Sequence, residues 1–386
     1  MLRLSVFIVC YILSFSVRFQ AEETNAYALT SDIIKHEVSI KHPGEKEAIK
    51  GILVQIPKAN GMHNAYYMDV ESVICHLDYC KVIPVRIFWD DLGVFQKYTL
   101  KEGATLEKYK DDVFDDEDYI KLTSIMSNQK SPYKDVYINE IIRVVDTNDD
   151  VDAYSGETAI VFDPKETVAG AALTCFTLWH WANNNDMKRI INTITAQSAS
   201  EEQLKNFLQL ASESYPFLSI QEAKKRQWYT PEFVHLVLAK TFAEPKFLKP
   251  AIDYIEHAPT AVYTKSIKEF FNTGDETFKI AILRSLKKLG NKTPKPYFDT
   301  FCSNISTLNA YPVLVNYLEV MSIHNPNSKQ INKQALSLLD ENFITARAAY
   351  WFLSNQQLDT PQQQRIDRFY KKIKSDYNSH RIPSTC

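Results

Sequence analysis

Acidic and amide side chains crowd residues 146 to 157 in a spacing that could bind a cation. Oxygen-bearing side chains stand at the first, third and fifth positions, and Glu157 stands at the twelfth, which is the ligand pattern of an EF-hand calcium loop. Such a loop needs glycine at its sharp turn, where this chain has Val151, and the flanking residues are more typical of strands than of helices. A solvated acidic turn is therefore the better interpretation.

The end of this loop carries a second pattern, Asp152-Ala153-Tyr154-Ser155-Gly156-Glu157-Thr158-Ala159. The octapeptide resembles the flavinylation motif of the FMN-binding domain family, known from flavoprotein subunits of sodium-pumping quinone reductases and Rnf-type electron-transfer complexes. In that family the last threonine is esterified to the phosphate of FMN. The resemblance implies covalent FMN on Thr158, with Asp152 as the motif acid and Ser155-Gly156 as the tight turn. Glu157 replaces the family's alanine, and its carboxylate would repel the phosphate unless it points into solvent.

Cys175 and His180 are the other candidates for chemistry, and they lie on a predicted helix over residues 165 to 183. Five residues apart, they fall on different faces, so a nucleophile and its base could not meet there. We expect Cys175 to be a packed core thiol and His180 to lie at the edge of an aromatic cluster. No carboxylate pair, Ser/His/Asp set or metal-ligand cluster has suitable spacing, so a hydrolase has little support, and we predict no catalytic or metal-binding residues.

The first 21 residues predict export. One basic residue, Arg3, precedes the apolar run Leu4 to Val17, which is too short for a comfortable membrane span, and polar residues follow. We expect an extracytoplasmic protein, periplasmic or secreted, with an uncleaved N-terminal anchor as the alternative. In an oxidising compartment Cys75 and Cys80 could close a hairpin as a disulfide, or both could stay unpaired.

Composition excludes two classes of protein. The apolar fraction of 45% is ordinary for a globular chain, so a disordered protein is excluded. The formal net charge is −3 with both signs dispersed, so no basic footprint for nucleic acid exists.

The first half of the chain predicts an α+β domain with an antiparallel sheet and helices. Seven of the nine glycines precede residue 171, so turns concentrate there. β-branched and aromatic runs predict strands at 51–56, 66–74, 82–89 and 94–100, and Pro84 would place its strand at an edge or a bulge. We expect a signal peptide, a polar leader and this domain at residues 1–21, 22–48 and 49–184.

An acidic cluster, Asp111 to Asp118, precedes the next predicted helix. It could bind calcium. The better interpretation is that Asp115 is the N-cap and the following acids complement the helix dipole.

A repeat of helix pairs follows a break at 183–186, with a domain boundary predicted within 182–200. In five segments an apolar helix and a polar turn precede a second helix that opens on an aromatic anchor, 30 to 33 residues apart: Phe217, Phe247, Phe278, Tyr311 and Phe343. This period predicts an all-α, HEAT-like α-solenoid over residues 186 to 375, in about five pairs, with a non-repetitive bundle as the alternative. A helix over 362–374 would cap it, and a tail over 376–386 is expected to be mobile.

Two functions of different classes remain open. The first is an extracytoplasmic electron-transfer protein that carries FMN and docks through its repeats to a protein partner, such as a membrane redox complex. The second is a non-enzymatic interaction protein whose first domain is degenerate and whose repeats present a binding surface. Glu157 favours the second, and the matching motif residues favour the first.

Overall fold

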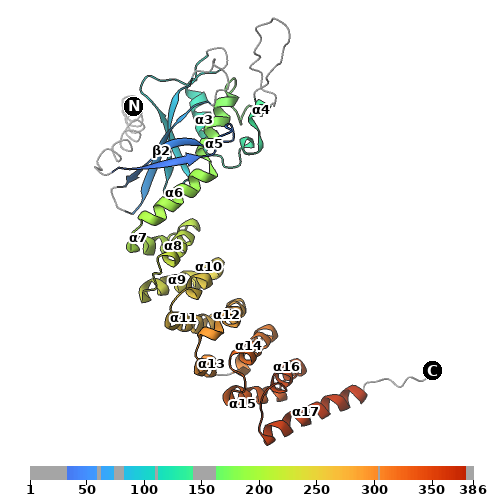
Figure 1. Cartoon of the computed structure of the whole chain (residues 1–386). Helices are drawn as coiled ribbons and strands as arrows, with labels where there is room; N and C mark the ends of the chain where they lie inside the picture. The colour runs from blue at the N-terminus through green and yellow to red at the C-terminus, as the bar shows by residue number, and fades with distance from the viewer. Residues whose placement is uncertain are drawn as a thin grey trace, which may run out of the picture. The chain divides into compact units, whose positions relative to one another are not determined.

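The computed structural model contains the two kinds of structure that the sequence predicts, a five-stranded antiparallel sheet with helices and then a helical region (Figure 1). Contacts divide the chain into two compact units between Gln203 and Leu204. The predicted α+β and all-α classes are confirmed. The structure describes residues 33–58, 62–73, 82–108, 112–141, 162–302 and 305–379.

The sheet is a meander in which each strand pairs with the next. Its strands are β1 (Ile34–Ile40), β2 (Ile49–Pro57), β3 (Asn64–Glu71), β4 (Pro84–Asp90) and β5 (Phe95–Leu100). β2 to β5 confirm the four predicted strands.

β1 corrects the prediction of a polar leader over residues 22 to 48. It pairs along its whole length with β2, with Val38 opposite Gly51. Only Val38 and Ile40 are buried on this edge strand, and polar residues alternate with them. Because most residues of this edge strand face solvent and are polar, its composition resembles that of a linker.

The edge position predicted for the strand of Pro84 was wrong. Its strand, β4, lies inside the sheet between β3 and β5, and the register shift in β4 lies at Phe88/Trp89. Pro84 is the first residue of β4, a position where a strand tolerates the missing N–H.

Three described helices of the first unit follow β5 in the chain. These are α3 (Asp116–Ser127), η2 (Pro132–Asp135) and α4 (Ile138–Ile141). Asp115 caps α3 in a reciprocal capping box with Asp118, which confirms the capping interpretation of the acidic cluster.

Two further helices complete the core of the first unit, α5 (Ala172–Ala182) and α6 (Asn185–Ser198). α5 starts later than predicted because the chain turns before it, with Gly170 at φ +73°. The indole of Trp89 on β4 donates to the carbonyl of Ala182 at 2.9 Å, and Tyr66 on β3 bonds Thr195 of α6 at 2.8 Å. α6 therefore packs on the sheet, and the first unit continues past residue 184, where the sequence had placed its end.

The second unit is built from helix pairs in two layers. One layer, called the even-numbered layer, consists of helices that contact one another in order: α8, α10, α12, α14 and α16. The odd-numbered helices α9, α11, α13 and α15 lie against this layer and form the other one (Figure 1). The division between units falls within α7. The helices are α7 (Glu201–Gln209), α8 (Ser214–Lys225), α9 (Pro231–Ala243), α10 (Leu248–Glu256), α11 (Thr260–Thr273), α12 (Glu276–Leu289), α13 (Lys295–Phe301), α14 (Tyr311–His324), α15 (Lys329–Ser337), α16 (Phe343–Leu353) and α17 (Thr360–Ser379).

The five predicted aromatic anchors all lie at the start of the second helix of a pair. They are in or just before the first turn of α8, α10, α12, α14 and α16. The ring of Phe217 packs on that of Phe247 at 5.1 Å, so consecutive anchors can contact each other. The period read from the sequence is therefore a structural period.

Side-chain ion pairs also join neighbouring repeats. Lys224 pairs with Asp253 at 2.5 Å, and Lys288 with Glu256 at 2.9 Å. The last helix, α17, runs on to Ser379, past residue 376 where the tail was predicted to start. Across the described helices, none combines the length and the apolar character that a bilayer span requires.

Candidate functional site

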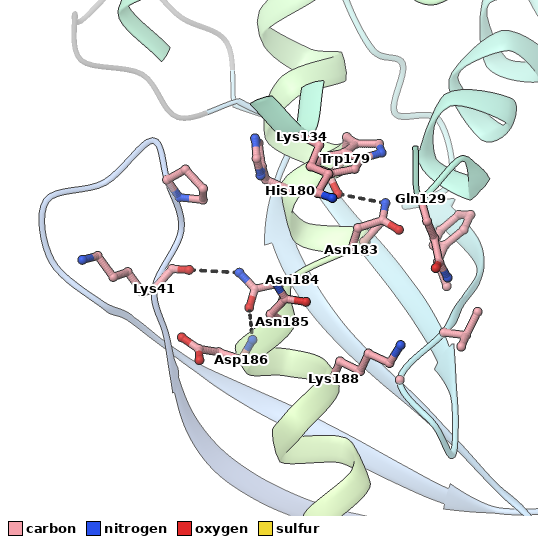
Figure 2. A pocket seen from close by; sticks show the side chains of 15 residues that line it. Lys41, Gln129, Lys134, Trp179, His180, Asn183, Asn184, Asn185, Asp186 and Lys188 are labelled. Carbon is pink, nitrogen blue, oxygen red and sulfur yellow. Dashed lines mark hydrogen bonds between the residues drawn. The ribbon is translucent and has the colours of Figure 1, made fainter. Parts of the chain in front are cut away.

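A pocket of about 690 Å³ lies in the first unit where five segments of the chain meet (Figure 2). The connection from β1 to β2 contributes Lys41, the turn between β4 and β5 contributes Gly93, and α3 is followed by Gln129. Lys134 comes from η2, and the junction of α5 and α6 contributes eight residues between Trp179 and Lys188. The volume is within the usual range for small-molecule sites, about 300 to 1,000 Å³.

The junction of α5 and α6 is held by its asparagines. Asn183 donates to the carbonyl of Met126 at 2.9 Å, and Asn184 donates to the carbonyl of Lys41 at 2.9 Å. The Asn184 oxygen also accepts from the backbone of Asp186 and Met187, which caps α6. One amide side chain thus fixes both a helix start and the neighbouring loop (Figure 2).

Gly93 allows the turn between β4 and β5 to approach α6. Its φ is +72°, and a Cβ there would lie 2.7 Å from the Cα of Lys188. Any side chain at this position would push the turn away from α6 and change this wall of the pocket.

The pocket is rimmed by positive charge. Lys41, Lys134 and Lys188 have exposed side chains, and none of them forms an ion pair with a residue in the described part of the chain. The lining carboxylate, Asp186, is paired with Arg189 at 3.0 Å. The balance of charge at the rim therefore favours an anionic ligand.

His180 lies on the wall of the pocket with its Nε2 buried and without a hydrogen-bond partner among the described residues. The residue is 9% exposed, and its ring packs against those of Phe176 and Trp179, at 4.4 and 4.8 Å between ring centres. Burial, and to a smaller extent the nearby His42, lowers its pKa from 6.5 to about 4, against the opposing effect of the Tyr133 backbone. The imidazole is therefore neutral at pH 7, with one unused polar atom beside a cavity.

His42 lies behind this wall and is structural. Its Nδ1 accepts from the backbone of Gly44 at 3.0 Å, and its Nε2 lies 3.1 Å from the carbonyl of Thr177. Burial lowers its pKa to about 4 as well. The bond to Thr177 holds the β1–β2 connection against α5, and the bond from Gly44 shapes the connection itself.

Cys175 is a core thiol, as the sequence predicted. It is fully buried, and this burial raises its pKa to about 11, which keeps it protonated and unreactive. His180 lies in an aromatic cluster, also as predicted. No group of His, Cys, Asp and Glu side chains within the described ranges could hold a metal ion.

The residues of the predicted flavin motif, Asp152, Ser155, Gly156 and Thr158, lie outside the described residues. Cys75, Cys80 and the predicted signal peptide lie outside them too. The described chain resumes at Phe162, four residues after Thr158. The ring of Phe162 packs on that of Tyr133 at 4.7 Å, and the residue after Tyr133 is Lys134 of the pocket.

Sequence reasoning missed this pocket because its residues are ordinary ones from distant segments. The run 183 to 186 was interpreted only as a break between domains. The one signal was the adjacency of three asparagines to a buried aromatic helix, since asparagine caps helices and bonds loops.

Comparison with known proteins gives no relative on which to base an assignment: no family model, no curated protein and no solved structure matches the chain.

Proposed function

We propose that the first unit binds a phosphate-bearing small molecule of nucleotide size in this pocket. The observation that carries the proposal is a set of three lysines around a cavity whose wall holds Nε2 of His180. Within the described part of the chain, none of these lysines has an ion-pair partner and this Nε2 has no hydrogen-bond partner. Lysine ammonium groups bind phosphate as point charges, and the buried imidazole offers one further hydrogen bond.

FMN is the candidate ligand within this class, because the octapeptide ending at Thr158 resembles the flavinylation motif. The pocket residues fit such a group: the volume suits it, Trp179 and Phe95 give aromatic wall, and the lysines suit its phosphate. When bound, the flavin would supply electron transfer. The contribution of the chain would be to neutralise the phosphate through Lys134 and Lys188 and to fix the molecule at Thr158.

A binding assay with purified full-length chain tests the phosphate requirement. We expect FMN and AMP to bind and riboflavin, which lacks the phosphate, to bind at least tenfold more weakly. Lys134→Gln and Lys188→Gln should each weaken FMN binding by roughly tenfold, about 1.4 kcal/mol. Lys35→Gln, an exposed change on β1, is the matched control and should have no effect. Equal affinity for riboflavin and FMN would refute the proposal.

A second experiment tests the covalent link separately. In a host that exports the chain and carries a flavin transferase, FMN on Thr158 should survive denaturation and appear in the intact mass. Thr158→Ala and Asp152→Ala should remove it, and Glu157→Ala should raise occupancy or leave it unchanged. If the wild type and Glu157→Ala both stay colourless and bind no phosphate ligand, the interaction protein is the remaining hypothesis.

A further inference from the structure

The last helix of the even-numbered layer, α16, exposes large apolar side chains. Phe343 is 57% exposed, Ile344 49% and Trp351 63%. Of the anchors at the same position in the two preceding repeats, Phe278 is 4% exposed and Tyr311 is 41% exposed. Among the described helices, none follows α16 in this layer, and α17 contacts α15 and α16.

These residues form one strip on α16. Phe343, Arg347 and Trp351 are four residues apart, and the Arg347 guanidinium lies 5.7 Å from the centre of the Phe343 ring. The strip continues onto α17, because Tyr350 contacts both the ring of Trp351 at 5.7 Å and that of Tyr370 at 6.1 Å. We call Phe343, Ile344, Arg347, Trp351 and Tyr370 the terminal strip.

The two helices that carry the terminal strip are rich in basic residues. α16 and α17 up to Lys374 carry one acidic residue, Asp367, and six basic ones, whereas the whole chain has a net charge of −3. Arg365 is paired with Asp340, and no ion pair to a described residue involves the other five. The basic residues are Arg347, Arg365, Arg368, Lys371, Lys372 and Lys374.

We propose that the terminal strip binds an acidic amphipathic helix of a partner protein. The distance from Phe343 to Trp351 along α16 is about 12 Å, so a helix of three turns would cover it. Its apolar face would lie on the aromatic residues, and its carboxylates would meet Arg347, Lys371 and Lys374. A second copy of this surface would bring like charges together, which argues against self-association here. The inference concerns the second unit and does not depend on the ligand of the first.

A designed peptide tests the proposal with the full-length chain. The probe is a fluorescein-labelled helical peptide of 18 residues with leucines at i, i+4, i+7 and i+11 and glutamates on the other face; the control peptide has lysines in place of glutamates. We expect the acidic peptide to raise the anisotropy and to bind at least tenfold more tightly than the basic one. Trp351→Ala should weaken binding at least tenfold, and salt should weaken it too.

Charge reversal provides the sharper arm. Lys371→Glu with Lys374→Glu should weaken the acidic peptide at least tenfold and improve the basic one, whereas Lys265→Glu, an exposed change on α11, should do neither. Lys265, Lys371, Lys374 and Trp351 are all exposed, and circular dichroism would confirm that each variant folds.

Three results would overturn the proposal. The first is equal binding of both peptides, and the second is binding that Trp351→Ala leaves unchanged. The third is a different occupant: dimerisation in ultracentrifugation, or binding to phosphatidylserine vesicles, that Trp351→Ala abolishes while the acidic peptide does not compete.

Discussion

Acid should destabilise the first unit through its two buried histidines. His42 and His180 are both neutral in the folded chain, because burial lowers their pKa values to about 4, whereas in the unfolded chain the pKa is near 6.5. Protons therefore bind the unfolded state more readily. Stability is fully present above about pH 6.5 and is lost as the pH falls towards 4.

The magnitude follows from proton linkage. At pH 5 an unfolded histidine is almost fully protonated and the folded one is still mostly neutral, so each histidine costs about 2 kcal/mol relative to pH 7. Because the folded state keeps both rings neutral at pH 5, the two losses add to about 4 kcal/mol. A loss of that size is a large part of the stability of an ordinary domain, about 5 to 15 kcal/mol.

His180→Phe isolates one of the two contributions. Phenylalanine keeps an aromatic ring in the cluster with Phe176 and Trp179 and removes the proton site. Between pH 7 and pH 5 we expect the free energy of unfolding to fall by about 2 kcal/mol in the variant and by about 4 kcal/mol in the wild type.

Urea unfolding at the two pH values, followed by tryptophan fluorescence, measures this difference, since Trp179 contacts the ring that is changed. The reasoning is refuted if His180→Phe loses as much stability on acidification as the wild type does.

Three further tests, all by urea unfolding, concern two glycines, two phenylalanines and one helix cap. Gly93→Ala should destabilise the first unit by about 2 to 3 kcal/mol, because it adds a clash with the backbone of α6 to a strained φ. Gly103 has a similar φ of +76° but open space around it, so Gly103→Ala should cost about 1 kcal/mol. Equal costs would contradict the close approach of Gly93 to α6. Phe278→Ala should destabilise the second unit by about 3 to 5 kcal/mol, because Phe278 is buried. Phe343→Ala should cost less than about 0.5 kcal/mol, because Phe343 is exposed. Similar losses of stability in the two variants would mean that the terminal strip is covered. Asp115→Ala should cost about 1 kcal/mol by removing the capping box of α3, and no loss would argue that the helix does not need its cap.

Periodicity explains what the sequence predicted well. β2 to β5 are rich in aromatic and β-branched side chains, and burial alternates along β4. The repeats bring an aromatic to the start of every second helix. Such signals are local, and tertiary contacts reinforce them. β1 shows the limit, because Val38 and Ile40 are too few to make a periodic signal.

The pocket could not be predicted for a different reason. Lys41 and Asn184 are joined by a hydrogen bond across 143 residues, and nothing near either residue marks the pair. Lysine is also the most ordinary surface residue, and Lys134 differs from others only in where the fold places it. Sequence patterns locate elements, whereas this site depends on how the elements meet.

The position of α6 at the end of the first unit has a consequence for synthesis on the ribosome. The five strands emerge first, and the face of the sheet that bears Tyr66 and Trp89 can be covered only when α5 and α6 have left the exit tunnel. The first unit therefore cannot complete its core until nearly all of its residues have emerged. Each later helix pair contacts mainly its neighbours, so it can fold as it emerges, and a pause in translation would leave the sheet domain more exposed to aggregation than the repeats.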